Sequence, residues 1–286
     1  MKTASNNQTT RELILVLAAS GKTGRRVADR LEQRSVAVRR ASRSAAIPFD
    51  WHDPTTWARA LEGVTAAYVV YTPDLAVPAA PGAIEQFTKL AVRSGVDRLV
   101  LLSGRGEEEA LRCERIVQNC GIEWTIVRAS WFNQNFSEGA FLDPVLGGAV
   151  ALPVGDVGEP FVDADDIAEV AVAALTESGH AGEVYEVTGP RLLTFAEAVT
   201  EIATASGHPV DYRQITPDEF EAGLVAQQVP EDAVWLLKYL FNEVLDGRNA
   251  FVTDGVQRAL GRAPRDFSDF ARAAAASGVW NQTVTA

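Results

Sequence analysis

Short apolar runs alternate with amphipathic stretches along the first half of the chain. The run Leu13 to Leu17 has no polar residue, as expected for a parallel strand that is covered on both faces. Further strand-like segments follow at 35–40, 66–71, 99–102 and 124–127. Between them apolar residues recur every three or four positions, as at Ile84, Phe87 and Leu90, which is typical of helices. This alternation predicts an α/β fold, a Rossmann-type doubly wound parallel sheet.

The second half of the chain has a mostly helical pattern. Ile167, Val170 and Ala174 lie on one face of a predicted helix. Thr194 and Thr216 each precede a glutamate by three residues, the spacing of a capping box at the start of a helix. We therefore predict a smaller, mostly helical C-terminal lobe over the carboxyl edge of the sheet, where open α/β sheets bind ligands.

The pattern divides the chain into three segments. Residues 1–10 are polar and are expected to form a disordered leader. Residues 11–155 are expected to form the sheet domain, and residues 156–286 the substrate-binding lobe, with a strand near 182–187 that rejoins the sheet.

Composition and charge narrow the class of protein. The 286 residues are 47% hydrophobic and 22% charged, which is ordinary for a globular protein, and the net charge is -12. That charge opposes binding to nucleic acid or an anionic membrane, because phosphates attract clustered Lys and Arg. No secretory h-region and no run of about 18 apolar residues is present. We expect a cytoplasmic monomer or homodimer that acts on a small molecule, with no nucleic-acid or membrane partner.

A glycine-rich turn follows the first predicted strand. Gly21 and Gly24 come directly after that strand and begin a helix, which lets the backbone approach a phosphate and the helix pack tightly. The helix N-terminus presents free N–H groups and a partial positive charge, and Lys22 adds a cation. The sequence therefore predicts a turn that binds the pyrophosphate of a dinucleotide, formed by Ala18, Ser20, Gly21, Lys22, Thr23 and Gly24.

This turn departs from the usual fingerprint at one position. Ala18 stands where the first glycine is expected, which is strained if the backbone there needs a positive φ. The turn is not a P-loop, although Gly21-Lys22-Thr23 matches the end of that motif, because position 16 is Val instead of Gly. A strand–helix turn that binds no ligand is the alternative interpretation.

The end of the second predicted strand indicates which dinucleotide binds. It carries arginines and no acidic residue, and Arg43 lies 19 residues after Gly24. An acid at this distance usually binds the free 2′-hydroxyl of NAD, whereas an Arg accommodates the 2′-phosphate of NADP. Ser42 can donate a further hydrogen bond. We therefore predict NADP(H) as the cofactor, bound by Ser42 and Arg43; a solvated run of charges is the alternative.

Several motifs together resemble a known family. They are Ala-Ala-Ser-Gly-Lys-Thr-Gly-Arg-Arg at 18–26, Ala-Ser-Arg-Ser at 41–44, Phe-Asp-Trp at 49–51, Leu-Leu-Ser-Gly-Arg-Gly-Glu at 101–107, Trp-Thr-Ile-Val-Arg-Ala-Ser-Trp-Phe-x-Gln-Asn-Phe at 124–136 and Phe-Val-Asp-Ala-Asp-Asp-Ile at 161–167. The combination resembles the NmrA-like atypical short-chain dehydrogenases. Within that group it is most similar to the branch of agroclavine and festuclavine dehydrogenases of ergot alkaloid biosynthesis and their bacterial relatives.

The resemblance implies roles for further residues. Asp50 and Trp51 would border the adenine, Thr72 and Pro73 would line the cofactor path, and Ser103 and Gly104 would lie near the nicotinamide. The segment 130–136 would form part of the substrate floor, with Trp131, Phe132 and Asn135 binding substrate. Packing of the lobe is an alternative role for Trp131 and Phe132.

The resemblance also shows that two catalytic residues of better-known relatives are missing from this sequence. Better-known short-chain dehydrogenases use a Tyr and a Lys four residues later, and alignment on Glu114 puts Gly106 and Ala110 at those positions. Reduction of a ketone leaves an alkoxide that needs a proton donor, whereas an iminium, a quinone or a conjugated alkene is less demanding. We therefore predict an NADPH-dependent reductase of an activated double bond, with no catalytic residue assigned. A non-catalytic redox sensor and an enzyme without net redox change are the alternatives.

Other polar residues receive structural interpretations. His52, His180 and His208 are scattered without metal-ligand spacing, so no metal site is predicted. Asp163, Asp165 and Asp166 are expected to cap a helix and to fill its first turn. Cys113 and Cys120 lie seven residues apart in a predicted helix, too far for a disulfide.

Overall fold

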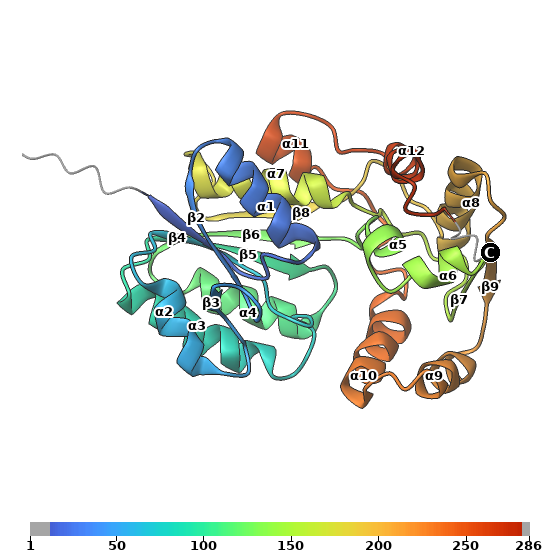
Figure 1. The fold of residues 1–286 in the computed structure, drawn as a ribbon, viewed down its shortest axis with the longest axis horizontal. Coiled ribbons are helices and arrows are strands. Elements are labelled where there is room, and N and C mark those ends of the chain that lie inside the picture. The colour runs from blue at the N-terminus through green and yellow to red at the C-terminus, as the bar shows by residue number, and fades with distance from the viewer. Residues whose placement is uncertain (1–11, 282–286) are drawn as a thin grey trace, which may run out of the picture.

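The computed structural model describes residues 12–281, and the predicted leader at 1–10 lies outside them. Its centre is a seven-stranded parallel sheet in the order β3-β2-β1-β4-β5-β6-β8 (Figure 1). The strands are β1 (Leu13–Val16), β2 (Ala37–Ser42), β3 (Ile47–Pro48), β4 (Ala66–Val69), β5 (Arg98–Gly104), β6 (Glu123–Ala129) and β8 (Glu183–Val187). The order reverses beside β1, so the crevice between β1 and β4 is the topological switch point. The predicted Rossmann-type fold is confirmed.

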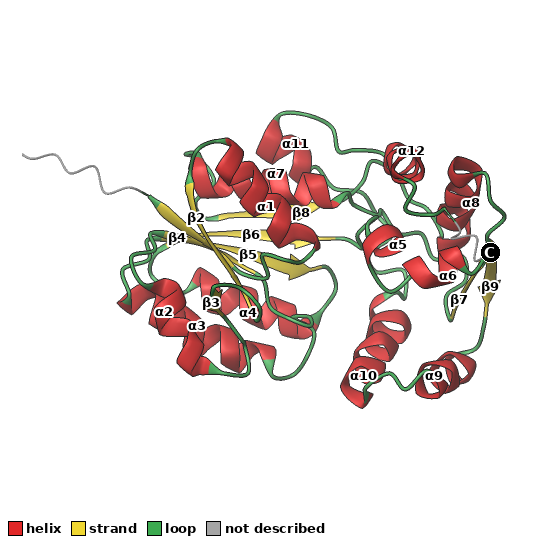
Figure 2. Cartoon of the chain, in the orientation of Figure 1, coloured by secondary structure: helices red, strands yellow, loops and turns green. Residues whose placement is uncertain are grey.

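Helices cover both faces of the sheet (Figure 2). One layer holds α1 (Lys22–Gln33), α7 (Ala164–Thr176) and α11 (Gly255–Leu260). The other layer holds α2 (Trp57–Leu61), α3 (Ala80–Arg93) and α4 (Glu108–Gln118). The short helix η1 (Pro54–Thr56) directly precedes α2. Side chains alternate across a strand, so Ile14 and Val16 of β1 pack with the first layer, whereas Leu15 packs with the second. Both faces are buried, which explains the continuous apolar run.

The lobe is mostly helical and lies beyond the carboxyl ends of the strands (Figure 1). It contains α5 (Asn135–Glu138), α6 (Leu142–Leu146), β7 (Ala149–Leu152), α8 (Phe195–Ser206), β9 (Asp211–Gln214), α9 (Pro217–Ala226), α10 (Glu231–Tyr239), the π-helix η2 (Leu240–Val244) and α12 (Phe267–Ser277). Its core is rich in aromatic rings, including Phe136, Phe195 and Phe241. The capping boxes predicted at Thr194 and Thr216 are confirmed.

The two bodies are interleaved in sequence. After residue 155 the chain returns to the sheet body to form α7, β8 and α11, and β8 pairs with β6. Segments of the lobe lie between these returns, so the backbone passes several times between the sheet body and the lobe. Within the described residues, no helix combines the length and apolar character needed to cross a membrane.

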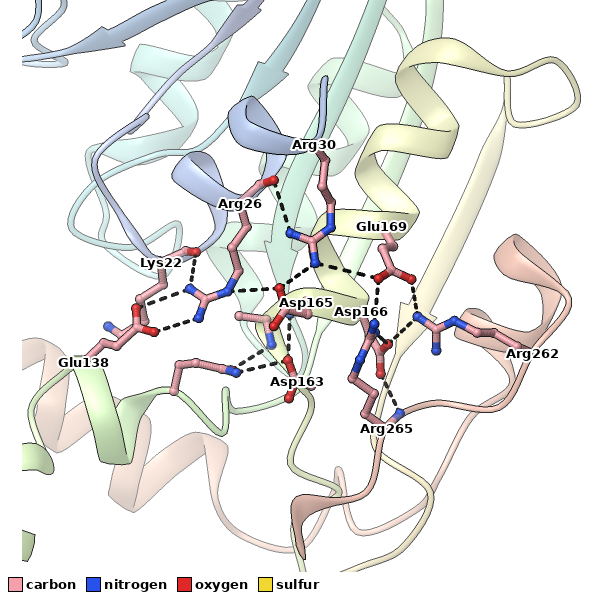
Figure 3. Close-up of polar contacts among 12 residues, drawn as sticks. Lys22, Arg26, Arg30, Glu138, Asp163, Asp165, Asp166, Glu169, Arg262 and Arg265 are labelled. Atoms are coloured by element: carbon pink, nitrogen blue, oxygen red, sulfur yellow. Dashed lines mark hydrogen bonds and ion pairs between the residues drawn. The ribbon is translucent and has the colours of Figure 1, made fainter. Parts of the chain in front are cut away.

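An ionic network joins the first helix to α7 and to the lobe (Figure 3). Arg26 of α1 binds Glu138 of α5 with an Nη2–Oε1 distance of 2.7 Å. Arg30, one turn later, binds Asp165 of α7 with an Nη2–Oδ1 distance of 2.6 Å. The network therefore holds the helix that begins at the glycine-rich turn against an element of the lobe.

The acidic residues at the start of α7 complete this network. Asp163 accepts the backbone N–H of Asp165 and caps the helix, and Asp165 and Asp166 fill its first turn, as predicted. Asp166 is fully buried and is bound by Arg262 at 2.6 Å and by Arg265. Asp165 and Asp166 are therefore structural ion-pair partners, and Asp163 is a helix cap.

Candidate functional site

A cleft of about 340 Å³ opens at the carboxyl ends of the central strands, between the sheet and the lobe. Its walls come from the glycine-rich turn, from the segments after β4, β5 and β6, and from Leu240 and Asn249 of the lobe side. Of the predicted site residues, the cleft is lined by Ala18, Gly21, Lys22, Thr23, Thr72, Pro73, Ser103, Gly104, Trp131, Phe132 and Asn135. The structure therefore brings together residues from four separate predicted segments.

The glycine-rich turn has the geometry of a phosphate cradle. Ala18 adopts a φ of +49°, so the strain predicted for an alanine at this position is present. Its carbonyl oxygen accepts the N–H of Gly21 at 2.8 Å, which closes the turn. An added Cβ at Gly24 would lie 2.2 Å from the same oxygen, so only glycine allows α1 to begin this close to β1.

The start of α1 is prepared for an anion. Its N-cap, Gly21, provides no side-chain cap, and the first turn contains no acidic residue. Free N–H groups and the helix dipole therefore face the cleft without a carboxylate in the first turn of α1. Lys22 is half-buried beside Gly139 of the lobe, and burial lowers the pKa of Lys22. These features fit the pyrophosphate of a dinucleotide.

The arginines at the end of β2 have different surroundings. Arg39 donates to the carbonyl oxygen of Ala60 at 2.9 Å, and Arg40 binds Glu32 at 2.8 Å. Arg43 lies exposed in the turn after the strand and forms no hydrogen bond or ion pair with any described residue. Its guanidinium is therefore available to a ligand beyond the end of β2.

Six of the predicted cofactor-binding residues lie outside the lining of the cleft: Ser20, Gly24, Ser42, Arg43, Asp50 and Trp51. Trp51 is 6% exposed, and its indole packs against Phe49 and Tyr71 in the core of the α3 layer. Its Nε1 donates to the carbonyl oxygen of Val70 at 3.0 Å. The side chain of Trp51 thus supports the sheet, and contact of Asp50 and Trp51 with adenine stays a prediction.

The ends of β5 and β6 form the middle of the cleft. Ser103 is buried and donates to Glu114 of α4 at 2.7 Å, and Glu114 also accepts from Arg128 of β6 at 2.8 Å. The carboxyl group of Glu107 packs against Gly104, because an added Cβ there would lie 2.2 Å from Oε1 of Glu107. Glu107 therefore lies directly against the position that the sequence assigns to the nicotinamide end.

Three acidic residues of the cleft were absent from the sequence prediction: Asp74, Glu107 and Glu159. Burial raises the pKa of Asp74, and burial together with the neighbouring Asp74 carboxylate raises the pKa of Glu107 well above its usual range. Burial also raises the pKa of Glu159 to about 7. Asp74 and Glu107 each follow a buried strand, which is where the loops of an α/β site lie, and Glu107 also ends the motif at 101–107.

The predicted substrate residues lie on the lobe side of the cleft. Trp131 is half-buried and contacts Phe141 and Phe241 with ring centroids 6.2 and 5.1 Å apart, so it also belongs to the packing of the lobe. Phe132 forms an isolated β-bridge with Val162, and Asn135 is the first residue of α5. Their contact with a substrate stays a prediction. The described part of the chain contains no cluster of His, Cys, Asp or Glu that could hold a metal ion.

Comparisons with known proteins agree with this site. The sequence profile of the NAD(P)H-binding family matches residues 18–178. The chain is 30% identical to the NAD(P)H azoreductase of Xenophilus azovorans, over 93% of this chain and 99% of that protein. It is 30% identical to festuclavine synthase II of Penicillium roqueforti, over 90% and 96% of the two chains. The solved triphenylmethane reductase of Citrobacter sp. complexed with NADP(H) shares the fold, with a TM-score of 0.75 and 18% identity over 91% and 99% of the chains. The resemblance to the festuclavine branch is confirmed.

Proposed function

The chain belongs to the NAD(P)H-binding family, and we propose that it is an NADPH-dependent reductase of a small organic substrate with an activated double bond. It is an oxidoreductase, in keeping with the relatives that span almost its whole length. The acceptor is an iminium or imine, a quinone or a conjugated alkene. The relative named an NAD(P)H azoreductase supports an acceptor of this activated kind.

The observation that carries the proposal is the pair Gly106 and Ala110, at the positions of the Tyr and Lys of better-known short-chain dehydrogenases. Gly106 has a φ of +75°, which a residue with a side chain rarely adopts, and an added Cβ would lie 2.5 Å from Nδ2 of Asn249, which would have to shift. Ala110 is fully buried in the core. Without that pair, a simple ketone lacks its usual proton donor, whereas an activated double bond accepts hydride more readily.

The choice of NADPH depends on Arg43. Arg39 and Arg40 are engaged within the protein, whereas Arg43 is exposed at the end of β2 and has no partner among the described residues. A guanidinium there can bind the 2′-phosphate in a charge-assisted, bidentate arrangement. The absence of an acid in this turn removes the usual partner of the NAD ribose.

We infer the roles of the protein groups from their positions around the cleft. When bound, the dinucleotide supplies hydride to the substrate. The N-terminus of α1 and Lys22 hold its pyrophosphate, and Ser103, fixed by Glu114, shapes the middle of the cleft. The rings of Trp131 and Phe132 orient an apolar substrate and exclude water from the reacting atoms.

The test is oxidation of NADPH, followed by the absorbance of the reduced nicotinamide, against cyclic imines, quinones, conjugated enones and simple ketones. We expect turnover of at least one activated acceptor and little or none of the ketones. Fast reduction of simple ketones would contradict the substrate class. Tight NADPH binding, measured by fluorescence, without turnover of any activated acceptor would instead favour a redox sensor.

A further inference from the structure

Two carboxyl groups meet in the wall of the cleft. Asp74 lies in the loop after β4, Glu107 lies in the loop after β5, and both line the cleft. β4 and β5 pair in parallel, with Val69 opposite Leu101, so their carboxyl ends bring the two loops side by side. Each carboxyl group lies close enough to influence the pKa of the other. Two acidic residues 33 positions apart therefore form one unit.

This arrangement favours a shared proton. Two neighbouring carboxylates repel each other, so the form in which one member of the pair is protonated is favoured. Neither residue forms an ion pair with a Lys or Arg of the described chain, and burial without a cation favours the neutral form. The pair therefore holds a single negative charge and one acidic proton.

The surroundings decide which residue keeps the proton. Asp74 accepts the backbone N–H of Ala76 at 2.9 Å, which stabilises its negative charge. Glu107 is 7% exposed, and its Oε2 has no hydrogen-bond donor. Asp74 is thus the carboxylate and Glu107 the neutral acid, lying against Gly104 at the end of β5.

We propose that Glu107, held protonated by Asp74, is the proton donor of this reductase. The proposal rests on the function proposed above and narrows its substrate class. An acid at this place serves an uncharged acceptor — an imine, a quinone or a conjugated enone — because reduction of such a bond consumes a proton. An iminium ion gains only hydride and needs none.

The step balances without any further reactant. Hydride from the reduced dinucleotide forms a bond to one end of the substrate double bond, and the π electrons move to the other end. That end takes the proton from Oε of Glu107 and forms an N–H, O–H or C–H bond. The substrate gains two electrons, the dinucleotide becomes oxidised, and Glu107 is left as a carboxylate. Repulsion from Asp74 then favours uptake of a new proton from water that enters the open cleft.

The other titratable and charged groups around the pair leave this assignment intact. They are Tyr71 after β4, Cys113 and Glu114 of α4, Arg128 of β6, and Arg248, which contacts the carbonyl oxygen of Gly106. Burial raises the pKa of Tyr71, and raises that of Cys113 to about 12, so both remain neutral near pH 7. Glu114 is held by Arg128 at 2.5 Å.

The first test is Glu107→Gln, which keeps the size of the side chain but removes the acid. We expect kcat for a quinone or an imine to fall about 100-fold, the usual scale of a lost general acid, while the Kd for NADPH stays unchanged. The matched control is Glu108→Gln, which removes the adjacent, exposed carboxylate outside the cleft and should leave kcat unchanged. An unchanged kcat in Glu107→Gln would overturn the proposal, and the reductase function would stand.

A second measurement needs neither turnover nor the Glu107 variant. The infrared spectrum of the wild-type protein at about pH 8.5, where Glu159 is mostly ionised because its pKa is about 7, should still contain the band of a buried protonated carboxyl group. In Asp74→Asn the partner charge is lost, so the band should disappear at a lower pH and the alkaline limb of kcat should move in the same direction. A spectrum without the band would refute the proton sharing. A band without turnover of any acceptor would count against the reductase function, and the donor role would fall with it.

Discussion

A Cβ atom on residue 24 would lie 2.2 Å from the carbonyl oxygen of Ala18 and 2.8 Å from that of Leu17. The first turn of α1 therefore begins in contact with the backbone that leaves β1. This contact sets the position of the helix N-terminus, and with it the phosphate cradle of the cleft.

Gly24→Ala is expected to destabilise the protein and to weaken cofactor binding together. Backbone atoms have to move to admit the methyl group, which costs about 2 kcal/mol and displaces the start of α1. Urea denaturation and a fluorescence titration with NADPH measure the two effects. The control is Gly82→Ala in α3, where nothing lies within 4 Å of an added Cβ, so stability should rise slightly. Equal behaviour of the two variants would contradict the steric argument.

Arg43→Ala is expected to reduce the preference for NADPH over NADH. A charge-assisted hydrogen bond to phosphate contributes about 2 kcal/mol, so the Kd for NADPH should rise about 30-fold while that for NADH changes little. Arg40→Ala removes an arginine of the same strand that binds Asp29 and Glu32, and should leave both constants unchanged. A wild-type protein that binds NADH as tightly as NADPH would show that Arg43 does not select the cofactor.

Glu159→Gln is expected to change how stability depends on pH. The pKa of Glu159 is raised by burial from 4.5 to about 7, so the folded state binds the proton more tightly than the unfolded state. The corresponding stability is fully present below about pH 4.5 and is lost as the pH rises through 7, a loss of about 3 kcal/mol. Gln removes the ionisable group and keeps an oxygen that can accept the N–H of Trp131.

The variant should therefore be more stable than the wild type at pH 8 and similar to it at pH 4.5. Urea denaturation at both pH values measures this difference. Glu62→Gln, at an exposed position, is the control and should shift neither value. A Glu159→Gln protein with the wild-type pH dependence would show that Glu159 titrates in its ordinary range.

Asp166→Asn is expected to loosen the attachment of the lobe. The fully buried carboxylate is bound by Arg262 and Arg265, and the neutral amide leaves Glu169 as the remaining carboxylate partner of both guanidinium groups. Since both arginines are about one-third exposed, the expected loss is about 2 kcal/mol in the free energy of unfolding. Asp269→Asn, in an exposed pair with Arg272 of α12, should lose less than about 0.5 kcal/mol. Similar losses in the two variants would argue against a structural role for the buried site.

Local patterns accounted for much of this protein. The apolar run at Leu13, the glycines at 21 and 24 and the threonines at 194 and 216 each act on neighbouring residues through strand burial, turn geometry or helix capping. Each of these effects involves residues that are close in sequence, so it can be predicted from the sequence alone. Trp51 shows what a local pattern does not include. Its motif predicts a position beside the adenine, whereas its contacts with Phe49 and Tyr71 depend on tertiary packing.

By itself, the sequence determined the strand–turn–helix unit, the alternating α/β fold and an arginine 19 residues beyond the last glycine of the turn. Only the tertiary structure decided that Asp74 and Glu107 share one wall of the cleft, and that Arg43 alone among its neighbouring arginines lacks a partner in the described chain. The reason is physical. Periodicity and turn chemistry are local, whereas a contact between distant side chains depends on strand order, on the paths of two loops and on the water that burial removes.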